Sequence, residues 1–389
     1  MSEINRDRRL KTPGPKRILC IDAAGGRGML AAALLGGLEA RLRRLARDPD
    51  LRLWDYFDLI GGASSSALLA AALAAGASVE EACGLYEDAG PAPDAPPKGD
   101  PVRRAKFDAA RLEAMLPEAF GDAQLCDPRI QTGVAVLVKP LESEAPVWWT
   151  NAPGGLGAER GFAEAVRASA GGDTAFDAAH GYADAALAGG ANPSLSLLRF
   201  ALDPKGLGWA AGPDKLLFIS LGAGRLRPPL ERRVFDARPD PNPAATAAGI
   251  ATRAAYALET ALFEAGEEAL SALKQLAAPR EGAKGHEPPM AFRRLDMELT
   301  PGVLASLGLT EAEIAAVIER TPLTAAKLDL LKRVGLAAGE RAFEPPEGVR
   351  ALEHVRALLP RGFDPLAFRN RGGGPNRLTT LASVFGGGR

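Results

Sequence analysis

LRLWDYFDLIGGASSSALLAAALAAG, residues 51–76, is the stretch that decides the fold. Residues 56–60 are aromatic and β-branched, which predicts a short strand, and Gly61-Gly62 predicts its end. Residues 67–75 are almost entirely strong helix formers. A strand that ends at glycines, presents a serine and turns directly into a helix is typical of a nucleophile elbow. In such a turn the serine Oγ is exposed at a helix N-terminus, whose backbone N–H groups favour an anion.

The three serines of this turn carry the candidate chemistry. Residues 62–66, GASSS, fit G-x-S-x-G at Gly62 and Ser64 and have Ser66 in place of the last glycine. This alignment identifies Ser64 as the candidate nucleophile. A serine before an apolar helix is also a common N-cap, and the segment taken alone favours that second interpretation.

A glycine-rich loop follows a second predicted strand nearer the N-terminus. Residues 17–22, RILCID, read as a buried strand, and AAGGRG at 23–28 precedes a predicted helix over 29–47. Loops of this kind bind anions, because glycine allows close approach to backbone N–H groups. One interpretation is a dinucleotide site, which matches weakly at Gly26, Gly28 and Ala31, with Asp48 or Asp50 as the distal acid.

The second interpretation is an oxyanion loop, and further motifs support it. Residues 22–28 resemble the D-G-G-G-x-R-G loop of patatin-like phospholipases, and other motifs of that family follow in the same order. These are LWDYFDLI at 53–60, VRAS at 166–169, YADAA at 182–186, the Asn192-Pro193 step, KLLFISLGAG at 215–224 and RRLDMEL at 293–299. The chain is identified as a member of this family over roughly residues 17–300.

The resemblance implies a fold and a mechanism. The fold is a three-layer α/β arrangement with a mainly parallel central sheet and a helical C-terminal extension. The activity is hydrolysis of lipid acyl esters, of the phospholipase A or lipase type, without metal or organic cofactor. Ser64 would attack the ester carbonyl, and Asp184 would take its proton. Backbone N–H groups would form the oxyanion hole, with Arg27 and Gly62 in support; the implied donors are Ala23, Ala24, Gly25, Gly26 and Ser65.

Glycine is missing from all three implied catalytic motifs. Where the family has glycine, this chain has Ala23, Ala24, Ser66, Ala185 and Ala186. If those positions require positive φ, each replacement costs about 1–2 kcal/mol or moves the loop. The alternative function is therefore a catalytically weak or inactive patatin-fold protein that binds lipid or a regulatory partner.

A histidine-dependent triad is disfavoured. The chain has three histidines, His180, His286 and His354. His180 lies four residues before Asp184 and could orient its carboxylate, but a surface loop is the favoured interpretation. His286 and His354 have no carboxylate or cysteine partner at metal-ligand spacing. Cys20, in a predicted strand, reads as a small buried hydrophobe.

Composition fits a large protein of the reducing compartment. Lys plus Arg total 47 against 48 Asp plus Glu in 389 residues, which disfavours bulk electrostatic binding of nucleic acid. Three cysteines do not suggest a disulfide scaffold. The charged N-terminus carries no signal peptide that we recognise, and no apolar run reaches the ~20 residues of a membrane span. We expect a cytoplasmic protein that meets membrane lipid peripherally; the sequence leaves the oligomeric state open, a homo-oligomer included.

The chain divides into three predicted regions. Residues 1–16 read as a flexible tail, 17–300 as the hydrolase domain, and 301–389 as a helical extension with a mobile basic tail. Further predicted elements are strands over 130–139 and 147–150, a proline-rich loop over 89–101, and helices over 244–276, 309–318 and 323–334.

Overall fold

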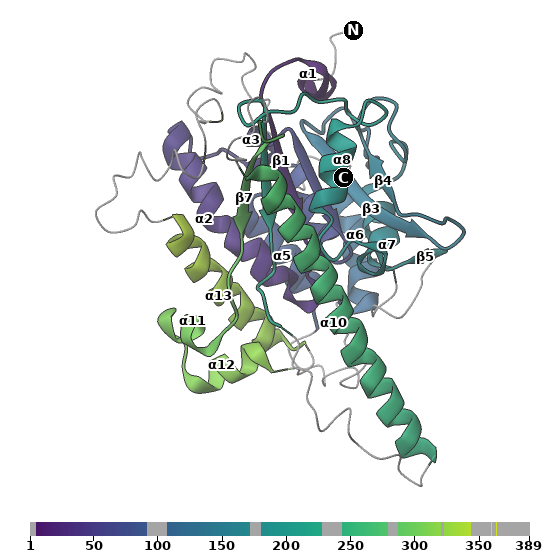
Figure 1. The fold of residues 1–389 in the computed structure, drawn as a ribbon, viewed down its shortest axis with the longest axis vertical. Coiled ribbons are helices and arrows are strands. Elements are labelled where there is room, and N and C mark those ends of the chain that lie inside the picture. The colour runs from purple at the N-terminus through teal and green to yellow at the C-terminus, as the bar shows by residue number, and fades with distance from the viewer. Residues whose placement is uncertain are drawn as a thin grey trace.

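The structure of the protein is a computed structural model (Figure 1). It describes residues 5–91, 107–171, 180–227, 243–278, 287–319 and 323–343, together with Leu359 and Phe363. His286, His354, the basic stretch 369–377 and most of the proline-rich segment lie outside the described residues.

Parallel strands form the centre of the fold. Within the described residues a seven-stranded sheet has the order β4-β3-β2-β1-β6-β7, and β5 pairs with β3 outside this path. Strands β3, β2, β1, β6 and β7 pair in parallel, whereas β4 and β5 run antiparallel to β3. The mainly parallel sheet is thus confirmed. The strand bounds are β1 Lys16–Ile21, β2 Leu59–Ala63, β3 Gly133–Pro140, β4 Val147–Thr150, β5 Tyr182–Ala183, β6 Leu216–Leu221 and β7 Ala291–Leu295.

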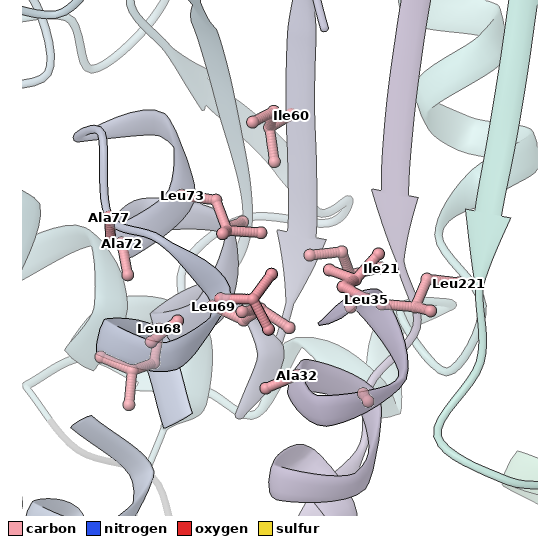
Figure 2. Packing of buried hydrophobic residues seen from close by; sticks show 14 of the residues in the cluster. Ile21, Ala32, Leu35, Ile60, Leu68, Leu69, Ala72, Leu73, Ala77 and Leu221 are labelled. Carbon is pink, nitrogen blue, oxygen red and sulfur yellow. The ribbon is translucent and has the colours of Figure 1, made fainter. Parts of the chain in front are cut away.

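Helices cover both faces of this sheet, which makes the predicted three layers. The helix bounds are α1 Asn5–Lys11, α2 Gly28–Ala46, α3 Leu53–Tyr56, α4 Ser66–Ala74, α5 Val79–Ala89, α6 Ala109–Phe120, α7 Phe162–Ala170, α8 Ser194–Leu202, α10 Pro243–Ala277, α11 Pro301–Ser306, α12 Glu311–Ile318 and α13 Ala325–Phe343. Figure 2 shows one interface, where Ile21, Ile60 and Leu221 of three strands meet Leu35 of α2 and Leu69 of α4.

The opposite face of the sheet has its own apolar cluster. Ile18 and Leu59 point to this side, because side chains alternate along a strand. They belong to one cluster with Leu197 of α8 and Leu273 of α10. Helix α10 crosses this face and extends beyond the body of the molecule (Figure 1). Every central strand is therefore buried on both sides, as expected for a parallel sheet.

Strand β2 differs from its prediction. Residues 53–56 form the short helix α3, and the strand continues through Gly61 and Gly62 instead of ending there. Both glycines allow close helix packing. A Cβ at Gly61 would lie 2.6 Å from Leu197 Cδ2, and one at Gly62 would lie 2.7 Å from the Ser66 carbonyl oxygen. The two glycines therefore mark the close approach of two helices, rather than the end of the strand.

The N-terminal segment also differs from its prediction as a flexible tail. Residues 5–11 form helix α1, which lies against the amino end of β2. The Arg9 guanidinium binds Asp58 at 2.8 Å, and Leu10 is buried. The Trp209 indole N–H donates to the Leu10 carbonyl at 3.0 Å. A charged sequence forms structure here because the rest of the chain supplies the partners for its polar groups.

The three helices predicted beyond residue 240 are present as α10, α12 and α13, although α13 continues past its predicted end at residue 334 to Phe343. Thr310 begins α12 through a capping box with Glu313. Helix α13 packs against α2 so closely that a Cβ at Gly37 would lie 2.1 Å from the Gly339 carbonyl oxygen. Residues 325–343 therefore belong to the same packed core as the sheet. None of the helices in the described ranges has the length and apolarity to cross a membrane.

Candidate active site

The candidate elbow and the candidate oxyanion loop begin side by side. Ile21 pairs with Gly62 in the parallel ladder between β1 and β2. Asp22 and Ala63 are thus neighbours where the two strands reach the same edge of the sheet. Ligand sites of open α/β sheets lie at this carboxyl edge.

Ser64 is held in a conformation that few side chains adopt. Its φ is +57°, and the other described non-glycine residues with positive φ are Arg47 and His180. Ser64 stands between β2 and α4, which is the strand-to-helix turn expected of a nucleophile elbow. Strain of this kind tends to occur at functional sites.

Ser169 holds the elbow in place. The Ser64 N–H donates to Ser169 Oγ at 2.9 Å, and Ser169 Oγ in turn donates to the Leu137 carbonyl at 2.6 Å. This one hydroxyl connects α7, β3 and the strained turn. The sequence placed Ser169 in the VRAS motif, but a motif does not reveal which backbone group its hydroxyl meets.

We expect Ser169→Ala to destabilise the fold by about 1–3 kcal/mol, because it leaves the buried N–H of Ser64 without its acceptor and removes the hydroxyl that donates to the Leu137 carbonyl. Urea unfolding followed by circular dichroism measures this loss. Ser143→Ala is the control, since the exposed Ser143 Oγ donates only to the nearby Ala145 carbonyl. Equal stabilities of the two variants would contradict the assigned role.

Asp184 directly follows β5, which pairs with the last residues of the same strand β3. Leu137 of β3 pairs with Ala63, and Lys139 pairs with Ala183, so both candidate residues directly follow strands that flank β3. Asp184 begins the 3-10 helix η2 (Ala185–Ala188), and its Oδ1 accepts the Ala186 N–H at 2.8 Å.

The site is closed in this conformation. Ser64 and Asp184 are each 1% exposed. Gly171, just after α7, leaves no room for a side chain, since its Cβ would lie 2.6 Å from the Asp184 nitrogen. The C-terminal end of α7 thus lies against both residues, through Ser169 on one side and Gly171 on the other.

The candidate oxyanion loop is short and internally bonded. Gly25–Arg27 forms the 3-10 helix η1, and the Arg27 N–H donates to the Ala24 carbonyl at 3.0 Å. The Ala23 N–H donates to the Ala191 carbonyl at 3.2 Å, so this predicted donor is already engaged. Of the predicted oxyanion donors, Ala24, Gly25, Gly26 and Ser65 remain. The Arg27 guanidinium donates to the Ala223 carbonyl at 3.0 Å, which supports a role in holding the turn.

The missing glycines leave the backbone unstrained. In this loop only Gly25 has a positive φ, +53°. None of the five positions where glycine is replaced has one; these are Ala23, Ala24, Ser66, Ala185 and Ala186. The alanines and the serine at these five positions therefore do not carry the cost of positive φ that the sequence predicted for them.

We expect the double variant Ala23→Gly/Ala24→Gly to show no gain in esterase rate and to lose about 0.4–1 kcal/mol of stability per site, because glycine costs more backbone entropy. Gly25→Ala is the opposite test: its Cβ would meet no atom within 4 Å, so backbone strain alone should destabilise it by about 1–2 kcal/mol. A large rate gain in the double variant would mean that the alanines obstruct the site.

Tyr86 of α5 connects the two turns, and sequence patterns did not single it out. Its hydroxyl donates to the Ser65 carbonyl at 3.0 Å. Its ring occupies the space beside Gly28, where a Cβ would lie 2.2 Å from Tyr86 Cε1. Burial raises the pKa of the Tyr86 hydroxyl, so it stays a hydrogen-bond donor. Gly28 thus serves close packing at the start of α2.

The remaining titratable side chains of interest are an exposed histidine and two buried cysteines. His180 occupies an exposed turn with φ of +52°. Burial raises the pKa of the Cys20 thiol, and it raises the pKa of the Cys83 thiol to about 11, so both stay protonated. In the ranges that the structure describes, no three His, Cys, Asp or Glu side chains come together as a metal site.

Comparison with known proteins adds independent findings. The family model described as patatin-like phospholipase matches residues 19–199. A Solanum tuberosum protein named "Probable inactive patatin-3-Kuras 1" is 30% identical over 140 residues, which is 34% of this chain and 37% of that protein. "Patatin-like protein 1" of Oryza sativa subsp. indica is 48% identical over 64 residues, 16% of this chain and 15% of that protein.

The alignments are local. The chain spans about a third of the length of the potato patatins that it matches. Among solved structures, the type III effector protein ExoU aligns with 96% of this chain and 79% of its own, with 14% sequence identity and a TM-score of 0.25.

Proposed function

We propose, from the premise that this chain belongs to the patatin-like phospholipase family, that it hydrolyses acyl esters of lipids through Ser64 and Asp184. The observation that carries the proposal is the left-handed backbone of Ser64 at a strand-to-helix turn, beside the loop of residues 22–27. The substrates would be phospholipids or other acyl-ester lipids, met at a membrane surface by a cytoplasmic protein.

The proposed reaction has two halves. Ser64 Oγ attacks the ester carbonyl while Asp184 accepts its proton, because a serine hydroxyl is a poor nucleophile without a base in reach. The oxyanion is stabilised by backbone N–H groups of Ala24, Gly25, Gly26 and Ser65. One such donor contributes a factor on the order of 10²–10³ in rate. Collapse of the intermediate releases the alcohol, which takes the proton from Asp184. Water then attacks the acyl-enzyme while Asp184 accepts its proton, and collapse of the second intermediate breaks the Ser64 Oγ–acyl bond, releases the fatty acid and returns the proton from Asp184 to Ser64 Oγ.

The second candidate is a weakly active or inactive protein that binds lipid or a regulatory partner. Its support is the burial of Ser64 and Asp184. An ester cannot approach a serine side chain that is 1% exposed until the residues that cover it move. One relative also bears the name of an inactive patatin. The backbone geometry of the loop argues against inactivity by strain, because the alanines have ordinary φ values.

Fluorophosphonate labelling of the purified protein distinguishes the two candidates. The reagent forms a bond only with an activated serine, and peptide mass spectrometry locates the adduct. We expect an adduct on Ser64 that is absent from Ser64→Ala and that forms faster with liposomes present. No adduct in either condition would favour the binding protein.

A further inference from the structure

We propose that Arg294 is a positioning residue that fixes the oxyanion loop, residues 22–27, at both ends. The inference rests on the proposed function for the role of this loop. Arg294 lies on β7, at the far edge of the sheet from Ser64, and Figure 1 shows β7 beyond β1 in the same layer.

The first end of the loop is held directly. Arg294 Nη2 donates to Asp22 Oδ2 at 2.6 Å, and Asp22 is the first residue after β1. The same guanidinium donates from Nη1 to Ser220 Oγ at 2.7 Å. Asp22 is buried, and burial raises its pKa to about 6 although Arg294 acts in the opposite direction. The charge of this carboxylate therefore depends on Arg294.

The second end is held through a carboxylate. Arg294 Nη2 also donates to Asp296 Oδ2 at 2.6 Å. Asp296 Oδ1 accepts the Gly224 N–H at 3.0 Å. The carbonyl of the preceding residue, Ala223, is the acceptor for the Arg27 guanidinium at the end of the loop. The path from Arg294 to Arg27 is therefore continuous.

The packing leaves little room for other arrangements. A Cβ at Gly222 would lie 2.0 Å from Asp296 Oδ2 and 2.5 Å from Arg294 Nη2, so the ion cluster lies directly against this backbone. Ser220 Oγ is 2.8 Å from Ser194 Oγ at the start of α8. Ala191 lies just before α8, and its carbonyl accepts the Ala23 N–H. This hydrogen bond is a third connection to the loop.

Removing the guanidinium would place two buried carboxylates beside each other. Two neighbouring carboxylates repel each other, and a buried charge without its partner costs several kcal/mol. The carboxylates of Asp22 and Asp296 would move apart, and the loop would lose its anchors at residues 22 and 27. The planar fork of arginine contacts both carboxylates at once, which the single ammonium of lysine does less well.

The test compares Arg294→Met and Arg294→Lys with Arg9→Met. Arg9 is a matched control, because its side chain is also 14% exposed and also binds an aspartate, Asp58. It differs in position, since Asp58 lies at the amino end of β2, away from Ser64. Two measurements are made on each variant: kcat and KM for a p-nitrophenyl ester, and hydrogen–deuterium exchange of peptides that cover residues 22–27.

For Arg294→Met we expect kcat to fall by about 10²-fold with KM changed by less than about threefold, as for loss of an interaction made in the transition state. Arg294→Lys should be intermediate and Arg9→Met close to wild type. Exchange in residues 22–27 should accelerate in the Arg294 variants only. Wild-type exchange in Arg294→Lys, or in a folded Arg294→Met, would overturn the inference. If the wild type shows no Ser64 adduct, the proposed function fails while exchange still decides the role of Arg294.

Discussion

Ser64→Ala is expected to reduce ester hydrolysis at least about 10³-fold, because no other group in the proposed mechanism can form the acyl-enzyme. The fold should persist, since Ser64 binds Ser169 through its backbone N–H, which alanine retains. Steady-state kinetics with a p-nitrophenyl ester and with phospholipid vesicles measure the effect. Residual activity above about a tenth of wild type would identify another nucleophile.

Ser64→Gly separates the chemistry of the residue from its strain. A φ of +57° costs a residue with a side chain about 1–2 kcal/mol, and glycine avoids this cost. Glycine itself loses about 0.5–1 kcal/mol more backbone entropy on folding. The glycine variant should therefore be inactive and at least as stable as Ser64→Ala, by up to about 1.5 kcal/mol. A glycine variant less stable than Ser64→Ala would mean that the turn relaxes around alanine.

Asp184→Asn is expected to lower kcat at least about 10³-fold, because an amide cannot accept the serine proton. The substitution is close to isosteric. Asparagine Oδ1 can still accept the Ala186 N–H, so the start of η2 and the melting temperature should be retained. Fluorophosphonate labelling of Ser64 should slow in parallel with kcat.

Asp108→Asn is the matched control for this variant. Asp108 also begins a helix with its side chain, because its Oδ1 accepts the Arg111 N–H at 3.3 Å, but it lies at α6. It should keep wild-type kinetics. An Asp184→Asn protein with wild-type kcat would remove Asp184 from the mechanism and leave Ser64 to be activated by another group.

Much of the fold follows from local sequence. The long helix α10, the strand β1 and the capped helix α12 are predicted within a few residues of their bounds, because periodicity, apolar runs and caps act over short distances. The predictions are wrong where contacts with segments distant in sequence determine the secondary structure. Gly61-Gly62 reads locally as a strand end, yet the helices packed on both sides of β2 make it part of the strand.

The sequence by itself carried the family resemblance, which predicted the mainly parallel α/β layout and the candidate pair Ser64 and Asp184 from short motifs. Only the tertiary structure decided that the alanines of the loop have ordinary φ, and that Ser169 and Arg294 support the site. Arg294 and Asp22 are 272 positions apart. A short motif reflects interactions between residues that are close in sequence. A buried polar group needs a hydrogen-bond partner, and here that partner is supplied by a strand that is distant in sequence.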